Sequence, residues 1–159
     1  MGVAERIAEL GLELPPEPLM PPHVRITFEW ARTMGDRVYL SGHGALDGRG
    51  APAGPFGRVP DQVTLEQAQA SARGAGVALI AALQRAVGDL DRVAAWLTVT
   101  GFVNAEPGYS QTTAVVNPVS DLLLDVFGDV GRHARTAIGA VALPLDLPVV
   151  VAAEVLIER

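Results

Sequence analysis

Small and apolar residues recur at steps of three and four along residues 65–87. The repeat positions are Ala68, Ala72, Gly76, Ile80, Leu83 and Val87. This spacing predicts one long amphipathic helix, and its small residues would let the helix pack closely on a sheet. Thr64 and Gln67 form a capping-box pattern at the start of this helix, and Gly88 supplies a stop at its end.

Two further segments have helical signals. Residues 113–127 are predicted to form a second long helix that ends at Gly128, and residues 3–10 a short one. Five prolines within residues 15–22 then force an extended connection. We therefore interpret residues 1–22 as an N-terminal helix and a proline-rich arm, which has too few residues to fold alone and should lie on the domain or on a neighbouring subunit.

Several runs rich in β-branched and aromatic residues, or alternating in polarity, predict strands. They span residues 25–33, 37–41, 93–103, 135–143 and 149–157. A turn signal at residues 34–36 joins the first two runs into a predicted hairpin, and the glycine-rich stretch 42–61 is expected to be an irregular loop. This order predicts an α+β fold, a mixed β-sheet with two main helices packed on one face. We expect a single domain over residues 1–159.

The composition adds an expectation about assembly and excludes some partners. Hydrophobic residues make up 49% of the chain and charged residues only 19%, so apolar surface is left over for subunit contacts. The net charge is −6, all 12 basic residues are scattered arginines, and nucleic acid is therefore not an expected partner. Without cysteine and with no pair of histidines at ligand spacing, no metal site is expected. No signal peptide or membrane span is visible, and we expect a cytoplasmic protein without a membrane partner.

Three short motifs in this order are similar to those of the Rid/YjgF family. Ser41-Gly42 closes the second predicted strand, Gly101-Phe102-Val103-Asn104 closes the strand after the long helix, and Gly131-Arg132-His133-Ala134-Arg135-Thr136-Ala137 opens the next to last strand. The resemblance covers nearly the whole chain and is closest to a longer, chorismate-mutase-like branch of the family. It implies a homotrimeric barrel with ligand pockets between subunits, and no metal or organic cofactor.

The resemblance also implies a chemistry, the hydrolysis of reactive enamines and imines. In the family an arginine holds the substrate carboxylate, and Arg135 is at that position. A planar guanidinium suits the role because it can donate two parallel hydrogen bonds to a carboxylate. The alternative for Arg135 is a structural ion pair with an acidic side chain of a neighbouring subunit.

The family's catalytic glutamate has no counterpart in this chain. The matching position on the last strand is Val150, or Ala152 in the other register, and neither is acidic. Glu154 is on the same predicted strand face, but each two-residue step moves a side chain by about 6.6 Å. Glu154 is therefore a candidate catalytic residue only if a bulge or a differently seated substrate compensates, and the alternative is an acid that faces solvent or another chain.

Other positions match the family in part. Phe28 is expected to wall the pocket where the family commonly has tyrosine, and Gly42 and Ala137 belong to the ligand-binding motifs. Asn117 matches a recurrent asparagine, although it could instead mark a helix start before Pro118. His43 is a second candidate catalytic residue, where members often carry glutamine, because histidine titrates near neutral pH. The alternative is a loop histidine that faces solvent.

Three functions follow from these residues. The first is an imine or enamine hydrolase that binds a small carboxylate through Arg135. The second is a trimer that binds a small metabolite without catalysis, which the apolar Val150 and Ala152 favour. The third is a biosynthetic enzyme that uses the same cleft for another reaction. Ribonuclease activity is disfavoured by the acidic charge, and chorismate mutase activity by the lack of a second convergent cation.

Overall fold

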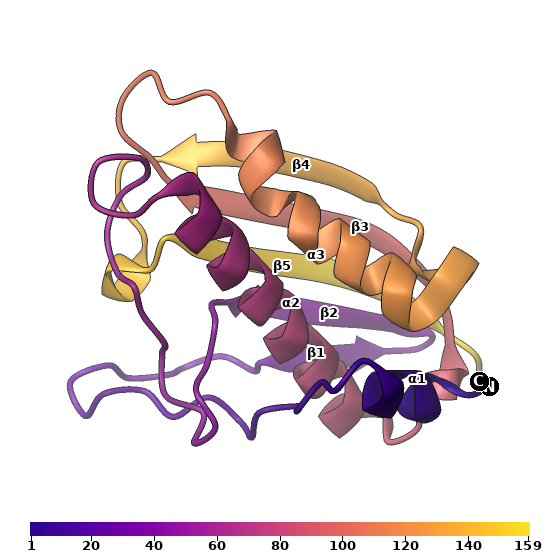
Figure 1. Ribbon diagram of the computed structural model, residues 1–159. Coiled ribbons are helices and arrows are strands. Elements are labelled where there is room, and N and C mark those ends of the chain that lie inside the picture. The colour runs from indigo at the N-terminus through magenta and orange to yellow at the C-terminus, as the bar shows by residue number, and fades with distance from the viewer.

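A mixed five-stranded sheet forms the base of the molecule in the computed structural model, which describes all of residues 1–159 (Figure 1). The strands are β1 (Ala31–Met34), β2 (Arg37–His43), β3 (Val93–Asn104), β4 (Ala134–Ala140) and β5 (Val149–Ile157). Their order across the sheet is β1-β2-β5-β3-β4. The β3–β4 pair is parallel and the other pairs are antiparallel. β1 and β4 are therefore the two edge strands.

Helices cover one face of this sheet, as Figure 1 shows. The two long helices are α2 (Leu65–Val87) and α3 (Thr112–Phe127). The short helix α1 (Val3–Glu9) contacts α3 and the turn that precedes β3. Single 3-10 turns η1 (Leu90–Arg92), η2 (Gly128–Gly131) and η3 (Pro144–Asp146) connect the elements. This arrangement confirms the predicted α+β fold with two main helices on one face of a mixed sheet.

The start of α2 has the predicted capping box. The Gln67 N–H donates to Thr64 Oγ1 at 3.1 Å, and the Thr64 N–H donates to Gln67 Oε1 at 3.0 Å. The helix ends at Gly88, whose φ of 78° is in the left-handed region that favours glycine.

The core lies between the sheet and α2 and α3. Along β5 every second residue from Val149 is buried, while Val150, Ala152 and Glu154 are partly exposed on the opposite face. Small residues bring the layers close, since a Cβ atom added at Gly101 of β3 would lie 2.7 Å from a methyl group of Val116 in α3. No helix covers the far face of the sheet, on which Val150, Ala152 and Glu154 lie.

Two predicted strands are shorter in the structure. Residues 25–30 are not paired with another strand, and the regular β1–β2 pairing begins only at Ala31. Just before β1, the Ser41 N–H donates to the Trp30 carbonyl at 3.0 Å. The Ser41 hydroxyl donates to the Glu29 carbonyl at 2.6 Å. β4 ends at Ala140, because that residue pairs with Asn104 where β3 itself ends.

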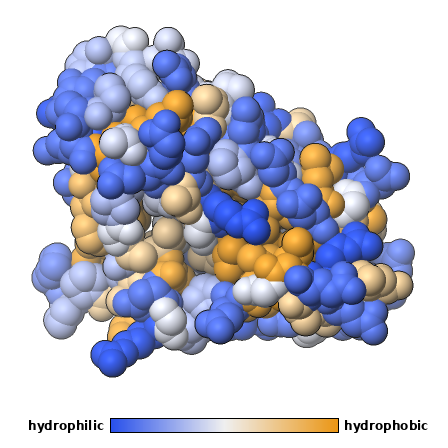
Figure 2. All heavy atoms as spheres, in the orientation of Figure 1, coloured by the Kyte–Doolittle hydropathy of each residue, from blue (hydrophilic) through white to orange (hydrophobic).

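The helical face is mainly hydrophilic, with separate apolar patches between the polar side chains (Figure 2). No helix of the structure has both the length and the apolar character needed to cross a membrane.

Candidate functional site

Arg135 lies on the edge strand β4 and extends over the helix-covered side of the sheet to α3. Its Nη1 donates to Ser120 Oγ at 3.0 Å, and its Nη2 donates to Asn117 Oδ1 at 2.9 Å and to the Thr113 carbonyl at 3.3 Å. The three acceptors are four and three residues apart on α3, so they lie along one face of the helix. Helix and strand together hold the guanidinium in one orientation.

Asn117 is in the second turn of α3 and not at its start, so the helix-start interpretation of this residue is wrong. Pro118 follows inside the helix and leaves the Ala114 carbonyl without its usual N–H donor. The Gln69 side chain of α2 donates to that carbonyl at 3.0 Å. The proline is therefore accommodated without an unpaired carbonyl group.

The charge of Arg135 has no partner within the chain. None of the four ion pairs in the structure includes Arg135, and its three acceptors are neutral oxygens. A guanidinium has five N–H groups, so the Nε–H and one Nη1–H remain free. Because the side chain is also partly exposed, this arrangement can attract and hold an anion.

Ser120 links Arg135 to a histidine. Ser120 Oγ is 2.9 Å from His133 Nε2, and His133 Nδ1 is 2.7 Å from the Gly131 carbonyl. Ser120, His133 and Arg135 line an open hollow of about 360 Å³ together with Leu124 and Arg132. Sequence analysis missed both Ser120 and His133 as site residues, although a helical-face reading of Thr113, Asn117 and Ser120 would have put the serine beside the asparagine.

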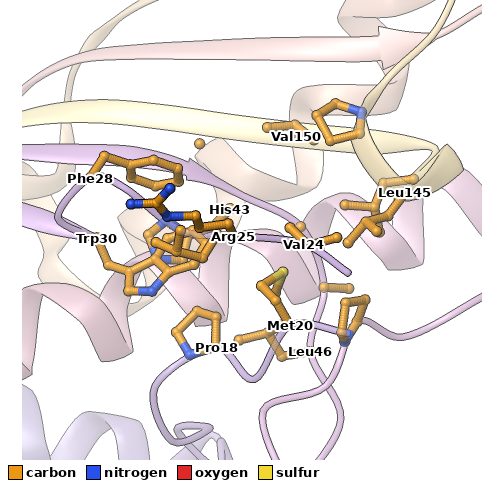
Figure 3. A pocket seen from close by; sticks show the side chains of 17 residues that line it. Pro18, Met20, Val24, Arg25, Phe28, Trp30, His43, Leu46, Leu145 and Val150 are labelled. Atoms are coloured by element: carbon orange, nitrogen blue, oxygen red, sulfur yellow. The ribbon is translucent and has the colours of Figure 1, made fainter. Parts of the chain in front are cut away.

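Three of the predicted residues meet in a different place. Phe28, Gly42 and His43 line a largely apolar cavity of about 220 Å³ between the β2 end of the sheet and residues 18–30. Figure 3 shows Phe28, Arg25, Trp30 and His43 gathered on one side of this cavity. Arg25 was not predicted, and no structural signal in its surrounding sequence marks it.

Val150, one of the two positions at which the sequence resemblance leads us to expect a glutamate, lines the same cavity. A Cβ atom added at Gly42 would lie 2.8 Å from a methyl group of Val150, so the close approach of β2 to β5 at this point requires glycine. The wall is therefore apolar at this position.

His43 is buried, with only 2% of its surface exposed, so the interpretation as a solvent-facing loop residue is wrong. Its Nδ1 lies 2.6 Å from the Ser41 carbonyl, its ring centroid is 5.1 Å from that of Trp30, and its Nε2 has no hydrogen-bond partner. Burial lowers the pKa of the imidazole, the Ser41 carbonyl raises it in part, and the charge of Arg85 lowers it further. The neutral ring donates from Nδ1, which leaves Nε2 as an acceptor.

Glu154 lies on the uncovered face of the sheet, between Tyr39 of β2 and Thr98 of β3. It shares that face with Val150 and Ala152, as predicted from strand alternation. Its carboxylate is 3.8 Å from Arg37 Nη1, and both side chains are about half exposed, so the pair is weak. Glu154 lines neither the cavity beside His43 nor the hollow beside Arg135.

Ala137 follows Arg135 by two residues on β4, and its carbonyl accepts a hydrogen bond from Thr112 Oγ1 at 3.2 Å. No group of three or more His, Cys, Asp or Glu side chains lies close enough to hold a metal ion. The predicted residues thus form two groups, one around Arg135 at the β4 edge and one around the apolar cavity.

The mixed sheet with two long helices on one face defines a chorismate-mutase-like α+β protein. The chain matches the family described as "YjgF/chorismate_mutase-like, putative endoribonuclease" over residues 6–155. The protein belongs to this YjgF family.

Solved structures over nearly the whole chain agree with this assignment. Atu1372 from Agrobacterium tumefaciens, of unknown function, is 28% identical, with a TM-score of 0.87 over 99% of this chain and 94% of that one. A "putative endoribonuclease" from Shewanella oneidensis is 25% identical, with a TM-score of 0.89 over 99% and 100% of the two chains. The Escherichia coli protein TdcF, solved with bound serine, is 16% identical and has a TM-score of 0.61 over 92% and 96%, which shows the fold alone.

A curated relative, Protein TCP17 of Trypanosoma cruzi, is 40% identical over 94 residues. The match covers 58% of this chain and 59% of TCP17, so the chain spans about three fifths of that relative's length.

Proposed function

We propose that the protein binds a small carboxylate through Arg135 and hydrolyses an enamine or imine carried by that ligand. The observation that supports this most directly is the free charge of Arg135. Three neutral acceptors on α3 fix the guanidinium, no acidic side chain of the chain neutralises it, and two N–H groups remain free. A fixed cation that lacks its counter-ion favours an anionic ligand.

The serine bound to TdcF supports the same ligand class, because serine carries a carboxylate next to an amino group. A 2-imino acid has the same carboxylate next to a C=N carbon. Water that attacks this carbon gives a 2-oxo acid and ammonia, and the reaction needs no redox group. We place this activity in the cytoplasm, in keeping with a chain that contains no cysteine.

The complete cleft lies between subunits in this proposal. Arg135 is on the edge strand β4, whereas Phe28 and His43 line a cavity at the β2 end of the sheet, so two strands, β3 and β5, separate the groups. A homotrimer that closes its sheets into a barrel would bring the β4 edge of one subunit to the cavity of the next. Arg135 would then hold the carboxylate while the apolar cavity accepts the rest of the ligand.

A second function is favoured by one observation, the apolar Val150 in the cavity wall. Without an acid at that position the cleft could bind a carboxylate and not turn it over. The two functions share the Arg135 site, and they differ in whether another group of the site transfers protons.

Carboxylate binding at Arg135 is tested by isothermal titration calorimetry with 2-oxobutyrate as the probe. We expect R135Q to weaken binding at least tenfold, since a charge-assisted bidentate contact contributes about 1.5–3 kcal/mol. R49Q is the matched control, because Arg49 is an exposed arginine of the loop after β2 and lines neither hollow. Equal affinities of R135Q and R49Q would contradict carboxylate binding at Arg135.

The catalytic half is tested by ammonia release from an imino acid generated in place by an amino-acid oxidase. We expect the wild type to accelerate ammonia release over buffer and R135Q to lose that acceleration. Binding of 2-oxobutyrate by a wild-type protein that shows no acceleration would support the non-catalytic function instead.

A further inference from the structure

We propose that Ser120 and His133 form a proton relay that serves as the acid–base group of the Arg135 site. This inference rests on the proposed imine hydrolysis and names the residues that would replace the family's missing glutamate. It assigns catalysis to the β4 edge, on the same chain as the carboxylate clamp, and not to Glu154 or His43.

Hydrogen bonding fixes the direction of the relay. The Gly131 carbonyl can only accept, so His133 Nδ1, 2.7 Å away, carries the proton. His133 Nε2 is then unprotonated and accepts the Ser120 hydroxyl proton over 2.9 Å. Ser120 Oγ in turn accepts from Arg135 Nη1 at 3.0 Å. Ser120 is thus placed to activate a water molecule or act as a nucleophile. His133 is the base, and the Gly131 carbonyl orients it.

The relay is open to a ligand. Ser120 and His133 are both partly exposed, and both line the hollow of about 360 Å³ that also contains Arg135. A carboxylate on Arg135 would hold its neighbouring carbon within reach of the Ser120 hydroxyl, which bonds the same guanidinium. His43, by contrast, has a buried Nε2, and Glu154 is on the opposite face of the sheet.

The relay is not required to hold Arg135. Asn117 and the Thr113 carbonyl already fix Nη2, so Ser120 supplies only one of three contacts. Nor does His133 satisfy a buried polar group that would otherwise be unpaired, because Ser120 is partly exposed and could bond water. The Ser120–His133 bond therefore has no clear structural need.

Each step of the reaction balances. The oxygen of a water molecule forms a bond to the C=N carbon as its proton passes to Ser120 Oγ and the serine proton passes to His133 Nε2. The imine nitrogen takes up a proton from solvent to give a carbinolamine. The relay then returns its proton to the amino group, the C–N bond breaks, and ammonia leaves as the C=O bond forms and the hydroxyl proton passes to solvent. Serine and histidine end in their initial protonation states.

The charges that face His133 are few. Arg132, which follows η2, is bonded to Asp129 at 3.0 Å, and β4 contributes Arg135. From α3 the residues that line the hollow are Ser120 and Leu124, and neither is charged. The hollow around His133 is thus lined by two guanidinium groups and by no carboxylate.

The decisive variant is H133Q, because glutamine can accept the serine hydrogen bond but cannot take up the proton. We expect kcat for ammonia release to fall about 100- to 10,000-fold, the range for loss of a general base. The affinity for 2-oxobutyrate should stay within about twofold of the wild type, because Arg135 is intact. S120A should show the same pattern, and S120T should recover activity. H23Q, at an exposed histidine that directly follows the proline-rich arm, is the matched control.

The possible results separate this inference from the proposed function. A wild-type protein that does not bind 2-oxobutyrate would overturn the proposed function and the relay with it. Binding without turnover would overturn the proposed hydrolysis and the relay, and would leave only carboxylate binding at Arg135. Turnover in H133Q within threefold of the wild type would overturn the relay alone. A parallel loss of affinity and turnover in H133Q and S120A would make these residues positioning groups for Arg135, and would also overturn the relay.

Discussion

At the scale of single residues, the buried His43 connects stability to pH. Burial lowers its pKa in the folded protein below the ordinary value of 6.5. The unfolded chain therefore binds more protons than the folded chain once the pH falls toward and below 6.5, and stability rises with pH in this window. Acidification from neutral pH should thus destabilise the fold through this ring.

We therefore expect a smaller loss of stability on acidification in H43Q than in the wild type. The check is the free energy of unfolding in urea at pH 7.5 and pH 5.5, compared as a difference between the two pH values for each protein. H23Q serves as the control, because His23 is exposed. The prediction would be wrong if H43Q and the wild type lost the same stability between the two pH values.

The family motif in the sequence named two residues that the structure brings into contact. Arg135 and Asn117 could be named from the family motif, and their 2.9 Å contact agrees with a shared site. Ser120 and His133 escaped notice because their contact depends on the register between α3 and β4, which a linear pattern does not contain. The burial of His43 could likewise not be predicted. It depends on the packing of its ring against Trp30 and on the irregular register at the end of β2, and both are properties of the folded chain.

At the scale of elements, periodicity predicted α2, α3, β3 and β5 to within about a residue or two, because each buries one regular face. Residues 25–30 alternate like a strand, yet alternation reports only which side chains are buried and not whether a partner strand is present. Four of them, Arg25, Ile26, Phe28 and Trp30, instead line the cavity beside His43. Tertiary contacts, and not the local sequence pattern, thus determine the structure of residues 25–30.

The contact between α2 and α3 gives a prediction at this scale. Gln69 donates to the Ala114 carbonyl, which Pro118 leaves without an intrahelical N–H donor. We expect Q69A to destabilise the fold by about 1–3 kcal/mol, the cost of an unsatisfied carbonyl in a partly buried position. In a P118A background the backbone N–H at position 118 can donate to the Ala114 carbonyl. The loss in the free energy of unfolding caused by Q69A should then be smaller.

A double-mutant cycle measured by urea unfolding checks this coupling. The informative quantity is the difference between the effect of Q69A with proline and with alanine at position 118. Equal effects in the two backgrounds would show that Gln69 does not compensate for Pro118.

At the scale of the whole molecule, the uncovered face of the sheet is where we expect subunits to contact one another. Phe102 on β3 lies opposite Ile138 of β4 on one side and Val150 of β5 on the other, so apolar side chains adjoin across three strands. The side chain of Ile138 is 46% exposed in the single chain. Such a contiguous apolar surface on one face of a sheet favours subunit contact.

We expect the wild type to be a homotrimer, at about 50 kDa for three chains of 16.6 kDa each, and I138D to be a monomer. An aspartate would have to be buried without a counter-ion at the contact of the three sheets, which costs several kcal/mol in each subunit. Size-exclusion chromatography with light scattering measures the mass. V141D is the matched control, because Val141 is 78% exposed beyond the end of β4.

The same pair of variants relates assembly to binding. If the cleft joins Arg135 of one subunit to the cavity of the next, monomeric I138D should bind 2-oxobutyrate at least tenfold more weakly than V141D, although its own Arg135 and α3 are unchanged. Circular dichroism would confirm that I138D remains folded. A folded monomer with wild-type affinity would instead locate the whole binding site at the β4 edge, where Arg135, Asn117, Ser120 and His133 lie within one chain.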